Sequence, residues 1–300
     1  MKLSVSIAGV EFKNPVFTGS GTFNSGREFV EFVDLSKIGA VVVKGVANKP
    51  WLGNPSPRIA ETYGGMLNSV GLQNLGVDHF IKEDVPFLRR YDTKIVVNLA
   101  GKTIEEYCEV ADKLRYADVD MLELNISCPN VKEGGVAFGV NAEMAALVTR
   151  EVKACSKQPL LVKLSPNVTD IVSIAKAVEA AGADGLTMIN TLIGMKIDVH
   201  KRKPVLANKM GGLSGPAIKP VGIRMVYQAA KEVGIPIIGL GGIMTGEDAI
   251  EYLMAGASAI AVGTANLVNP SATMEVLQGI IDYMNLYGVT DIKDLVGVIA

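Results

Sequence analysis

The sequence is poor in the residues that cross-link small proteins or bind metals. Its 300 residues include 3 cysteines, 2 histidines and 1 tryptophan, and only 6% are aromatic. The cysteines, Cys108, Cys128 and Cys155, are odd in number and form no Cys-x-x-Cys pair, which is typical of a protein from a reducing compartment. A chain of this length buries about three quarters of its unfolded surface. Small scaffolds that depend on disulfides or a structural metal are therefore excluded.

No charge of one sign dominates the chain. It carries 29 Lys and Arg against 31 Asp and Glu, a formal net charge of −2, which provides no field for attracting nucleic acid or anionic lipid. No apolar run approaches the roughly 18 residues that a membrane span requires. Glu11 ends the apolar start Met1–Val10 before a signal sequence is complete, so this start predicts a short N-terminal β-hairpin. We expect a cytoplasmic protein with no nucleic-acid or membrane partner.

What the chain does contain is a repeated unit of a short apolar run, a turn of small residues and an amphipathic stretch. The runs are almost continuously apolar rather than alternating, as expected for parallel strands that are buried on both faces. Eight such runs predict one α/β domain over residues 1–300, a closed (β/α)8 TIM barrel, with an open doubly wound sheet as the alternative. The runs are Pro15–Ser20, Ala40–Val46, Lys94–Gly101, Met121–Pro129, Leu160–Pro166, Gly185–Leu192, Pro236–Ile243 and Ala259–Asn266.

Amphipathic stretches between the runs predict the helices of the barrel. Two segments, Ala47–Tyr91 and Ile193–Gly215, are longer than simple crossovers need. We expect them as long βα-loop insertions at the C-terminal mouth, where they form walls of the active site or a partner surface; plain surface insertions are the alternative. The expected helices are Glu28–Ile38, Thr103–Tyr116, Asn141–Cys155, Val168–Ala181, Ile218–Val233 and Thr245–Ala255.

Polar residues stand at the ends of six predicted strands. Because the C-terminal ends of barrel strands converge on one mouth, we expect these side chains to line one site, although each alone could be a cap or a solvent-facing residue. The strand ends carry no histidine, and the one nearby carboxylate, Glu123, is expected to face the helices or lie behind the site. Neither a metal centre nor a pair of glycosidase carboxylates is therefore predicted. The six residues are Ser20, Lys44, Asn98, Asn125, Lys163 and Asn190.

Glycines close the last two predicted strands. Gly241-Gly242 and Gly263-Thr264 lie where barrels commonly hold a phosphate on backbone amides, and glycine is needed there because a Cβ would block the approach. Met244 takes the place of the third glycine of a dinucleotide fingerprint, so no NAD module is predicted. Flavin mononucleotide (FMN), with a lysine near the edge of the ring that becomes negative on reduction, fits this mouth, and so does a phosphosugar.

Cys128 differs from the other two cysteines in its position. A free cysteine is usually a small buried hydrophobe, and we expect this of Cys108 and Cys155. Cys128 ends the fourth predicted strand, beside Asn125 and Asn130 and before a glycine-containing loop. A thiol in this place is positioned to take or give a proton.

These residues belong to an ordered set of motifs that covers nearly the whole chain. The motifs are Val43-Lys44-Gly45, Asn68-Ser69-Val70-Gly71-Leu72-Gln73-Asn74, Asn125-x-Ser127-Cys128-Pro129-Asn130, Val162-Lys163-Leu164, Ile189-Asn190-Thr191 and the two glycine sites. The set resembles the catalytic subunits of the class 1 dihydroorotate dehydrogenases. The resemblance implies bound FMN and the oxidation of (S)-dihydroorotate to orotate in pyrimidine synthesis. It also implies that Cys128 is the catalytic base, which removes the C5 proton while hydride leaves C6.

The resemblance further implies which residues bind the two small molecules. For FMN they are Ser20, Lys44, Gly45, Asn98, Asn125, Lys163, Ile189, Gly215, Gly241, Gly242, Gly263 and Thr264. For the substrate they are Lys44, Asn68, Ser69, Val70, Gly71, Leu72, Asn125, Asn190 and Thr191. Orotate is a flat anion rich in amide groups, which asparagine side chains can pair in kind while a lysine neutralises the carboxylate.

Two segments indicate a subclass within this family. Val131–Gly135, followed by Phe138-Gly139, and Gly64–Leu67 resemble the NAD⁺-linked type 1B rather than the fumarate-linked type 1A. Type 1B implies a partner subunit with FAD and a [2Fe-2S] cluster, since this chain has no cluster cysteines, and a heterotetramer built on a homodimer of this chain. A dihydropyrimidine dehydrogenase-like barrel, a Schiff-base aldolase using Lys163 and a non-catalytic flavin- or phosphate-binding barrel remain as alternatives.

Overall fold

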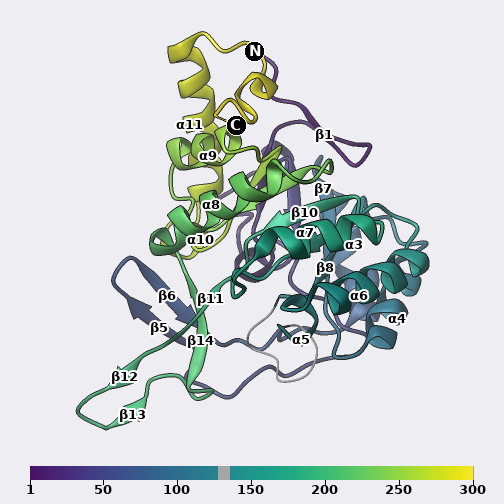
Figure 1. Cartoon of the computed structure of the whole chain (residues 1–300), viewed down its shortest axis with the longest axis vertical. Helices are drawn as coiled ribbons and strands as arrows, with labels where there is room; N and C mark the ends of the chain where they lie inside the picture. The colour runs from purple at the N-terminus through teal and green to yellow at the C-terminus, as the bar shows by residue number, and fades with distance from the viewer. Residues whose placement is uncertain (128–135, 300) are drawn as a thin grey trace.

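The computed structural model describes residues 1–127 and 136–299, and its centre is a closed barrel of parallel strands (Figure 1). Neighbouring strands pair in chain order, and β16 pairs with β3 to close the ring. Each strand lies within one of the eight predicted runs, so the (β/α)8 barrel is confirmed and the open sheet is wrong. The strands are β3 (Val16–Thr18), β4 (Ala40–Val42), β7 (Lys94–Leu99), β8 (Met121–Asn125), β9 (Leu160–Lys163), β10 (Gly185–Met188), β15 (Ile237–Leu240) and β16 (Ala259–Val262).

The helices cover the outside of this barrel, and five of the six predicted ones are present. In Figure 1, α4, α6, α7 and α8 flank the strands β7, β8 and β10. Side chains cap the first N–H groups of α4, α6, α7 and α9, and α9 begins with a capping box between Thr245 and Asp248. The five helices are α4 (Ile104–Leu114), α6 (Ala142–Cys155), α7 (Ile171–Ala180), α8 (Lys219–Ala230) and α9 (Gly246–Met254).

The predicted helix Glu28–Ile38 is wrong. This segment forms successive turns and one 3-10 helix, η1 (Leu35–Lys37). Asp34 has an extended backbone, and its side chain accepts a hydrogen bond from the Ser36 N–H, so it caps η1 instead of continuing a helix. Aspartate and serine compete with helical hydrogen bonding in this way, which overrides the apolar spacing of the segment.

Several further helices were not predicted from the sequence. The longest is α11 (Ala272–Tyr287), which packs against α9 and the barrel strand β3. A continuous helical stretch lies near the end of the insertion after β4 and contains a π-helical turn, η2. These and the short helices are α1 (Ser20–Phe23), α2 (Val77–His79), η2 (Phe80–Asp84), α3 (Val85–Leu88), α5 (Val136–Gly139), η3 (Pro216–Ile218), α10 (Ala265–Val268), α11 and η4 (Ile292–Leu295).

The N-terminal hairpin is confirmed. Strands β1 (Val5–Ile7) and β2 (Val10–Phe12) pair antiparallel, and Ile7 and Phe12 are buried in the core. The N–H of Lys2 donates a 2.8 Å hydrogen bond to the carbonyl oxygen of Thr290, which holds the two ends of the chain together. Both termini therefore lie at one end of the molecule (Figure 1).

The two long insertions form a second sheet at the opposite end of the molecule (Figure 1). One insertion follows β4 and the other follows β10, so both leave the C-terminal ends of barrel strands. They join because β6 pairs antiparallel with β14, and Leu67, Ala60 and Leu206 form a small core of their own. The strands are β5 (Ile59–Thr62), β6 (Gly65–Asn68), β11 (Leu192–Met195) and β14 (Met210–Ser214), with a hairpin of β12 (Ile197–Asp198) and β13 (Lys203–Pro204) at the tip. Among the described residues, no helix combines the length and apolar character needed to cross a bilayer.

Candidate active site

A cavity lies at the C-terminal mouth of the barrel and encloses about 1100 Å³, including the space open to solvent. All twelve residues that the resemblance implies for FMN line it, as do eight of the nine implied for the substrate. The strand-end prediction is therefore correct in its geometry: Ser20, Lys44, Asn98, Asn125, Lys163 and Asn190 surround one space. The insertions complete the wall with Ile59, Met66 and Ser214.

A buried ion pair lies on one side of the cavity floor. The Lys163 ammonium donates to Ser20 Oγ at 3.3 Å and lies 3.9 Å from Glu123 Oε1. Glu123 is 2% exposed and accepts a 2.5 Å hydrogen bond from Asn98 Nδ2. It faces the barrel interior, not the helices, because it shares a face of β8 with Asn125 two residues later.

The asparagines continue this network across the floor. Asn125 Nδ2 donates to Asn98 Oδ1 at 3.2 Å, and Ser127 Oγ donates to Asn125 Oδ1 at 3.1 Å. Asn190 Nδ2 then donates to Ser127 Oγ at 2.9 Å. Each amide is thus held in one orientation by its neighbour. Ser127 is fully buried beneath the cavity lining and was not predicted as a site residue.

The loop after β6 forms a third wall. Gly71 and Leu72 both have positive φ, at 75° and 52°, and an added Cβ on Gly71 would lie 2.8 Å from the Asn54 backbone nitrogen. This close packing fixes the loop on the Pro-rich segment before β5. Asn68, Val70, Gly71 and Leu72 line the cavity. Ser69 does not line the cavity, because it is fully buried and its Oγ accepts a 3.0 Å hydrogen bond from Asn54 Nδ2.

The two glycine sites follow the neighbouring strands β15 and β16, and both line the cavity. Gly241 and Gly242 have φ angles of 129° and 73°, which favour glycine. The hydroxyl group of Tyr252, which burial keeps protonated by raising its pKa, donates a 2.7 Å hydrogen bond to the Gly241 carbonyl oxygen. An added Cβ on Gly263 would meet no protein atom closer than 3.9 Å, so the space beside it belongs to the cavity.

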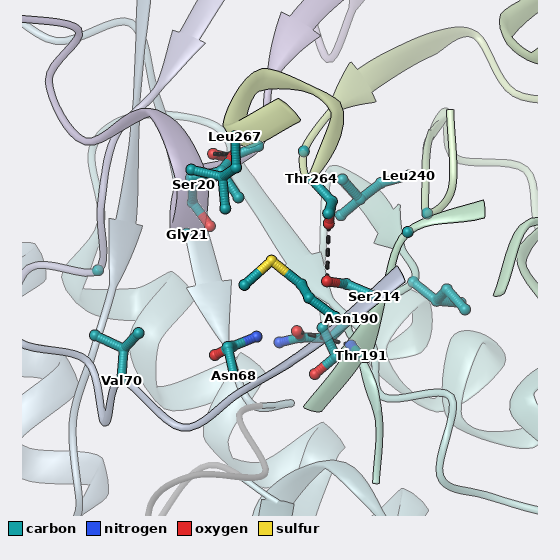
Figure 2. A pocket seen from close by; sticks show the side chains of 18 of the residues that line it. Ser20, Gly21, Asn68, Val70, Asn190, Thr191, Ser214, Leu240, Thr264 and Leu267 are labelled. Carbon is teal, nitrogen blue, oxygen red and sulfur yellow. Dashed lines mark hydrogen bonds between the residues drawn. The ribbon is translucent and has the colours of Figure 1, made fainter. Parts of the chain in front are cut away.

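Figure 2 shows how these groups divide the cavity. Asn68, Asn190 and Thr191 gather on one side. Thr264, whose Oγ1 donates a 2.8 Å hydrogen bond to Ser214 Oγ, lies on the side away from Asn68. One part of the cavity therefore offers amides and the other offers hydroxyl groups and backbone N–H groups. This arrangement can hold a planar polar ring at one end and a phosphate at the other.

Cys108 and Cys155 are not among the residues that line the cavity. Cys128, the predicted base, lies outside the described residues. Cys108 lies on α4 near Cys155 at the end of α6, and burial together with the Cys155 thiol raises the pKa of Cys108 to about 12. A thiol with this pKa is almost never ionised at neutral pH. No cluster of three or more metal-binding side chains occurs in residues 1–127 and 136–299.

Sequence reasoning missed some lining residues and the buried neighbour Ser127. Gly19, Gly21 and Thr22 adjoin Ser20 in the chain, and adjacency alone was a usable signal. Glu123 was expected either to face the helices or to lie behind the site, and strand alternation, which puts it on the face of Asn125, decides for the second position. Contacts made by Ile59, Met66 and Leu267 depend on how distant segments pack, and no local pattern marks them. The further missed lining residues are Ser214, Ile218 and Leu240.

Comparison with known proteins identifies the family of this chain. Residues 2–284 match the family model described as dihydroorotate dehydrogenase. A protein of Alkaliphilus metalliredigens is 68% identical over 99% of this chain and 98% of its own length, and one of Lachnoclostridium phytofermentans is 59% identical over 99% of each chain. Both are described as dihydroorotate dehydrogenase B (NAD⁺), catalytic subunit.

The fold comparison gives the same family. The crystal structure of the dihydroorotate dehydrogenase of Eimeria tenella in complex with ferulenol superposes with a TM-score of 0.84 at 25% identity. The alignment covers 99% of this chain and 88% of that one. The chain therefore belongs to the dihydroorotate dehydrogenase family of flavin-dependent oxidoreductases.

Proposed function

We propose that this chain oxidises (S)-dihydroorotate to orotate in de novo pyrimidine synthesis, as the catalytic subunit of an NAD⁺-linked dihydroorotate dehydrogenase. The observation that carries the proposal is the linked set of amides and ammonium groups around one cavity whose far end is lined by glycine turns. Relatives named as this subunit match over almost their whole length. In this proposal, residues 1–300 form one FMN-binding domain.

The cavity fits FMN in the chemistry of its donors. The backbone of Gly241, Gly242, Gly263 and Thr264 would hold the phosphate, because these positions leave space where a side chain would stand. Lys163 and Asn98 would meet the polar edge of the ring, where cationic and donor groups favour the reduced form. The other residues that would contact FMN are Ser20, Lys44, Gly45, Asn125, Ile189 and Gly215.

Dihydroorotate would lie against the amide side of the cavity. Asn68, Asn125 and Asn190 present donors and acceptors that match the ring amides of the substrate. Lys44, whose ammonium donates to the Gly21 carbonyl oxygen at 3.3 Å, would neutralise the substrate carboxylate. Thr191, Val70, Gly71 and Leu72 would close the space around it. Ser69 would act only by holding the loop on Asn54.

The reaction breaks two C–H bonds and forms the C5–C6 double bond of orotate. The Cys128 thiolate takes the proton from C5, and this assignment comes from the sequence alone. Bound FMN supplies the acceptor for the hydride that leaves C6. The asparagines would hold the substrate ring in one orientation, which lowers the entropic part of the barrier.

The electrons must then leave this chain. A partner subunit with FAD and a [2Fe-2S] cluster would pass them to NAD⁺, because the three cysteines of this chain cannot ligate a cluster. The assembly would be a cytoplasmic heterotetramer, two of each subunit, around a homodimer of this chain. Co-expression with such a partner and assay of NAD⁺ against fumarate would distinguish the NAD⁺-linked from the fumarate-linked type.

One anaerobic experiment tests the oxidation itself. The purified chain should carry FMN, and dihydroorotate should bleach its visible absorption. Bleaching by reduced pyridine nucleotide and re-oxidation by uracil instead would indicate a dihydropyrimidine dehydrogenase-like enzyme. A yellow protein that never bleaches would be a non-catalytic flavin barrel. Borohydride trapping of a ketose phosphate on Lys163 would indicate an aldolase.

Two substitutions separate the assigned roles. Cys128→Ala should nearly abolish bleaching while FMN stays bound. In the unsubstituted protein the bleaching rate should rise between about pH 6 and about pH 9, because a thiol with an ordinary pKa near 8.5 becomes thiolate there. Lys163→Ala should weaken FMN binding or slow its reduction. Full activity of the Cys128→Ala variant would remove this thiol from the mechanism.

A further inference from the structure

Glu123 is a buried carboxylate that the proposed reaction does not use. It is 2% exposed, and it lies in the middle of β8, whose other residues are apolar except Asn125. It is not among the residues that line the cavity, so a ligand in the cavity would not touch it. A carboxylate is costly to bury, and here its polar partners are residues of the cavity lining.

The register of the strands explains these contacts. Asn98 on β7 pairs with Glu123 on β8, and Asn125 on β8 pairs with Lys163 on β9. Registered residues of parallel strands project to the same face, so all four side chains lie inside the barrel in two adjacent layers. By register, Asn98 shares the layer of Glu123 and Lys163 lies in the next layer, and both of these lining residues contact Glu123.

Glu123 has two effects on these lining residues. It accepts the Asn98 amide N–H, which leaves the Asn98 carbonyl oxygen to accept from Asn125 and so fixes the orientation of both amides. Its negative charge lies 3.9 Å from the Lys163 ammonium in a site where both side chains are at most 7% exposed. Water screens such a pair poorly, so the carboxylate offsets much of the positive potential that Lys163 gives the cavity.

We infer that Glu123 is a positioning residue that acts through Asn98 and Lys163 and sets the reduction potential of the flavin in this cavity. The inference rests on the proposed function, in which Lys163 meets the edge of the ring that becomes negative on reduction. With Glu123 present, the bound flavin is reduced at a moderate potential and can pass its electrons on. Without the carboxylate, the uncompensated ammonium favours the reduced form.

The test is the midpoint potential of the flavin in Glu123→Gln. Glutamine has the same shape and keeps an oxygen for Asn98 Nδ2, so the substitution removes mainly the charge. We expect the ratio of reduced to oxidised flavin, at a fixed potential set by a reference dye, to rise about tenfold. For a two-electron couple this equals about 30 mV.

A matched control distinguishes an effect of the Glu123 charge on the flavin potential from the general effect of removing a buried carboxylate. Asp120 lies just before β8, at the opposite end of the strand from the cavity, and pairs with Arg89 and Lys94. Asp120→Asn also removes a carboxylate from cationic partners. It should lower stability but leave the flavin potential unchanged.

A second pair of variants covers the case in which Glu123→Gln does not fold. Lys163→Met leaves Glu123 unpaired and should lower the flavin potential. Adding Glu123→Gln to Lys163→Met removes both charges, and the potential should return toward that of the unsubstituted protein. Equal potentials in the single and double variants would overturn the inference, as would an unchanged potential in a folded Glu123→Gln protein. Failure of the unsubstituted chain to bind flavin would instead count against the proposed function.

Discussion

The hydroxyl group of Tyr252 on α9 donates a 2.7 Å hydrogen bond to the carbonyl oxygen of Gly241, at the turn that follows β15. The Tyr252 ring can lie there because Gly222 and Gly239 leave room for it: a Cβ on Gly222 would be 1.9 Å from the hydroxyl oxygen. A helix on the outside of the barrel thus fixes a turn that faces the cavity. Tyr252 does not itself line the cavity.

The first prediction concerns this hydrogen bond. Tyr252→Phe keeps the ring and removes one bond with a net worth of about 1 kcal/mol, so the affinity for FMN should fall about fivefold. Riboflavin lacks the phosphate that the Gly241-Gly242 turn would hold, so its affinity should stay the same. Quenching of flavin fluorescence measures both dissociation constants.

A tyrosine far from the cavity provides the control for this measurement. Tyr227→Phe on α8 removes a hydroxyl group that only pairs with Lys231, and it should change neither affinity. If Tyr252→Phe weakened FMN and riboflavin equally, the hydrogen bond would not act on the phosphate end.

The second prediction compares two glycines of the proposed phosphate site. An added Cβ on Gly242, which has a φ of 73°, would lie 2.8 Å from the Gly215 carbonyl oxygen and from the Lys219 backbone nitrogen. Gly242→Ala should therefore lower the melting temperature of the flavin-free protein. Gly263→Ala meets no protein atom closer than 3.9 Å and should leave that temperature unchanged.

Adding FMN should reveal an effect of Gly263→Ala that the melting temperature of the flavin-free protein does not show. Gly263→Ala places a methyl group in the cavity, so FMN should raise its melting temperature less than it raises that of the unsubstituted protein. A full FMN-induced shift in Gly263→Ala would mean that the phosphate does not lie against this glycine.

The barrel and most of its lining could be predicted because both follow from local patterns. Residues such as Val96 and Val97 are adjacent and both fully buried, which occurs in a strand covered on two faces. Once eight such strands are assumed to form a barrel, their polar ends must converge. This is why Asn98 and Lys163, 65 positions apart in the sequence, were predicted to share one site.

The parts that could not be predicted depend on pairing between distant segments. Nothing in the sequence near Met66 or Ser214 indicates that β6 pairs with β14, because this register is set by packing of the two insertions. The orientation of Ser69 could not be predicted either, because it depends on a hydrogen bond from Asn54 in another segment. The helix predicted at Glu28–Ile38 failed for a local reason, the Asp34 cap, which apolar spacing alone does not detect.

The third prediction concerns stability at low pH. Burial by itself would raise the pKa of Asp120, but hydrogen bonds from the Ile95 N–H and from the side chains of Lys94 and Arg89 outweigh burial and lower it. Because the pKa is lower in the folded than in the unfolded state, where it is about 3.9, the carboxylate stabilises the fold fully above about pH 4. This stabilisation is lost as the pH falls below about 4 toward the folded-state pKa.

Asp120→Asn should therefore cost about 1–3 kcal/mol at neutral pH, because it leaves Lys94 without its carboxylate and Arg89 with only the exposed Asp118. The difference in melting temperature from the unsubstituted protein should shrink as the pH is lowered from about 5 to about 3. Asp118→Asn, at a mostly exposed carboxylate near the same Arg89, should change the melting temperature little at any pH. A constant difference for Asp120→Asn across this range would contradict the assignment.

The fourth prediction concerns Ser127, which lies beneath the cavity lining and would contact neither FMN nor the substrate. Its hydroxyl group donates to Asn125 Oδ1 at 3.1 Å and accepts from Asn190 Nδ2 at 2.9 Å, so it fixes two amides that would bind the substrate. Ser127→Ala removes both bonds. Asn125 keeps its bond to Asn98 and Asn190 keeps the bond from the Thr191 N–H, so each amide loses one of the contacts that orient it. At a net worth of about 1 kcal/mol for each bond, the affinity for orotate should fall about tenfold or more.

Titration with orotate, followed by the change in the flavin spectrum, measures this affinity. The FMN content should stay close to that of the unsubstituted protein, because Asn98 and Lys163 keep their own partners. Ser156→Ala, which removes a hydroxyl group that only bonds to the Val152 carbonyl oxygen at the end of α6, serves as the control and should leave orotate binding unchanged. An unaltered orotate affinity in Ser127→Ala would show that Asn125 and Asn190 are held in place without this hydroxyl group, or that the substrate does not pair with them.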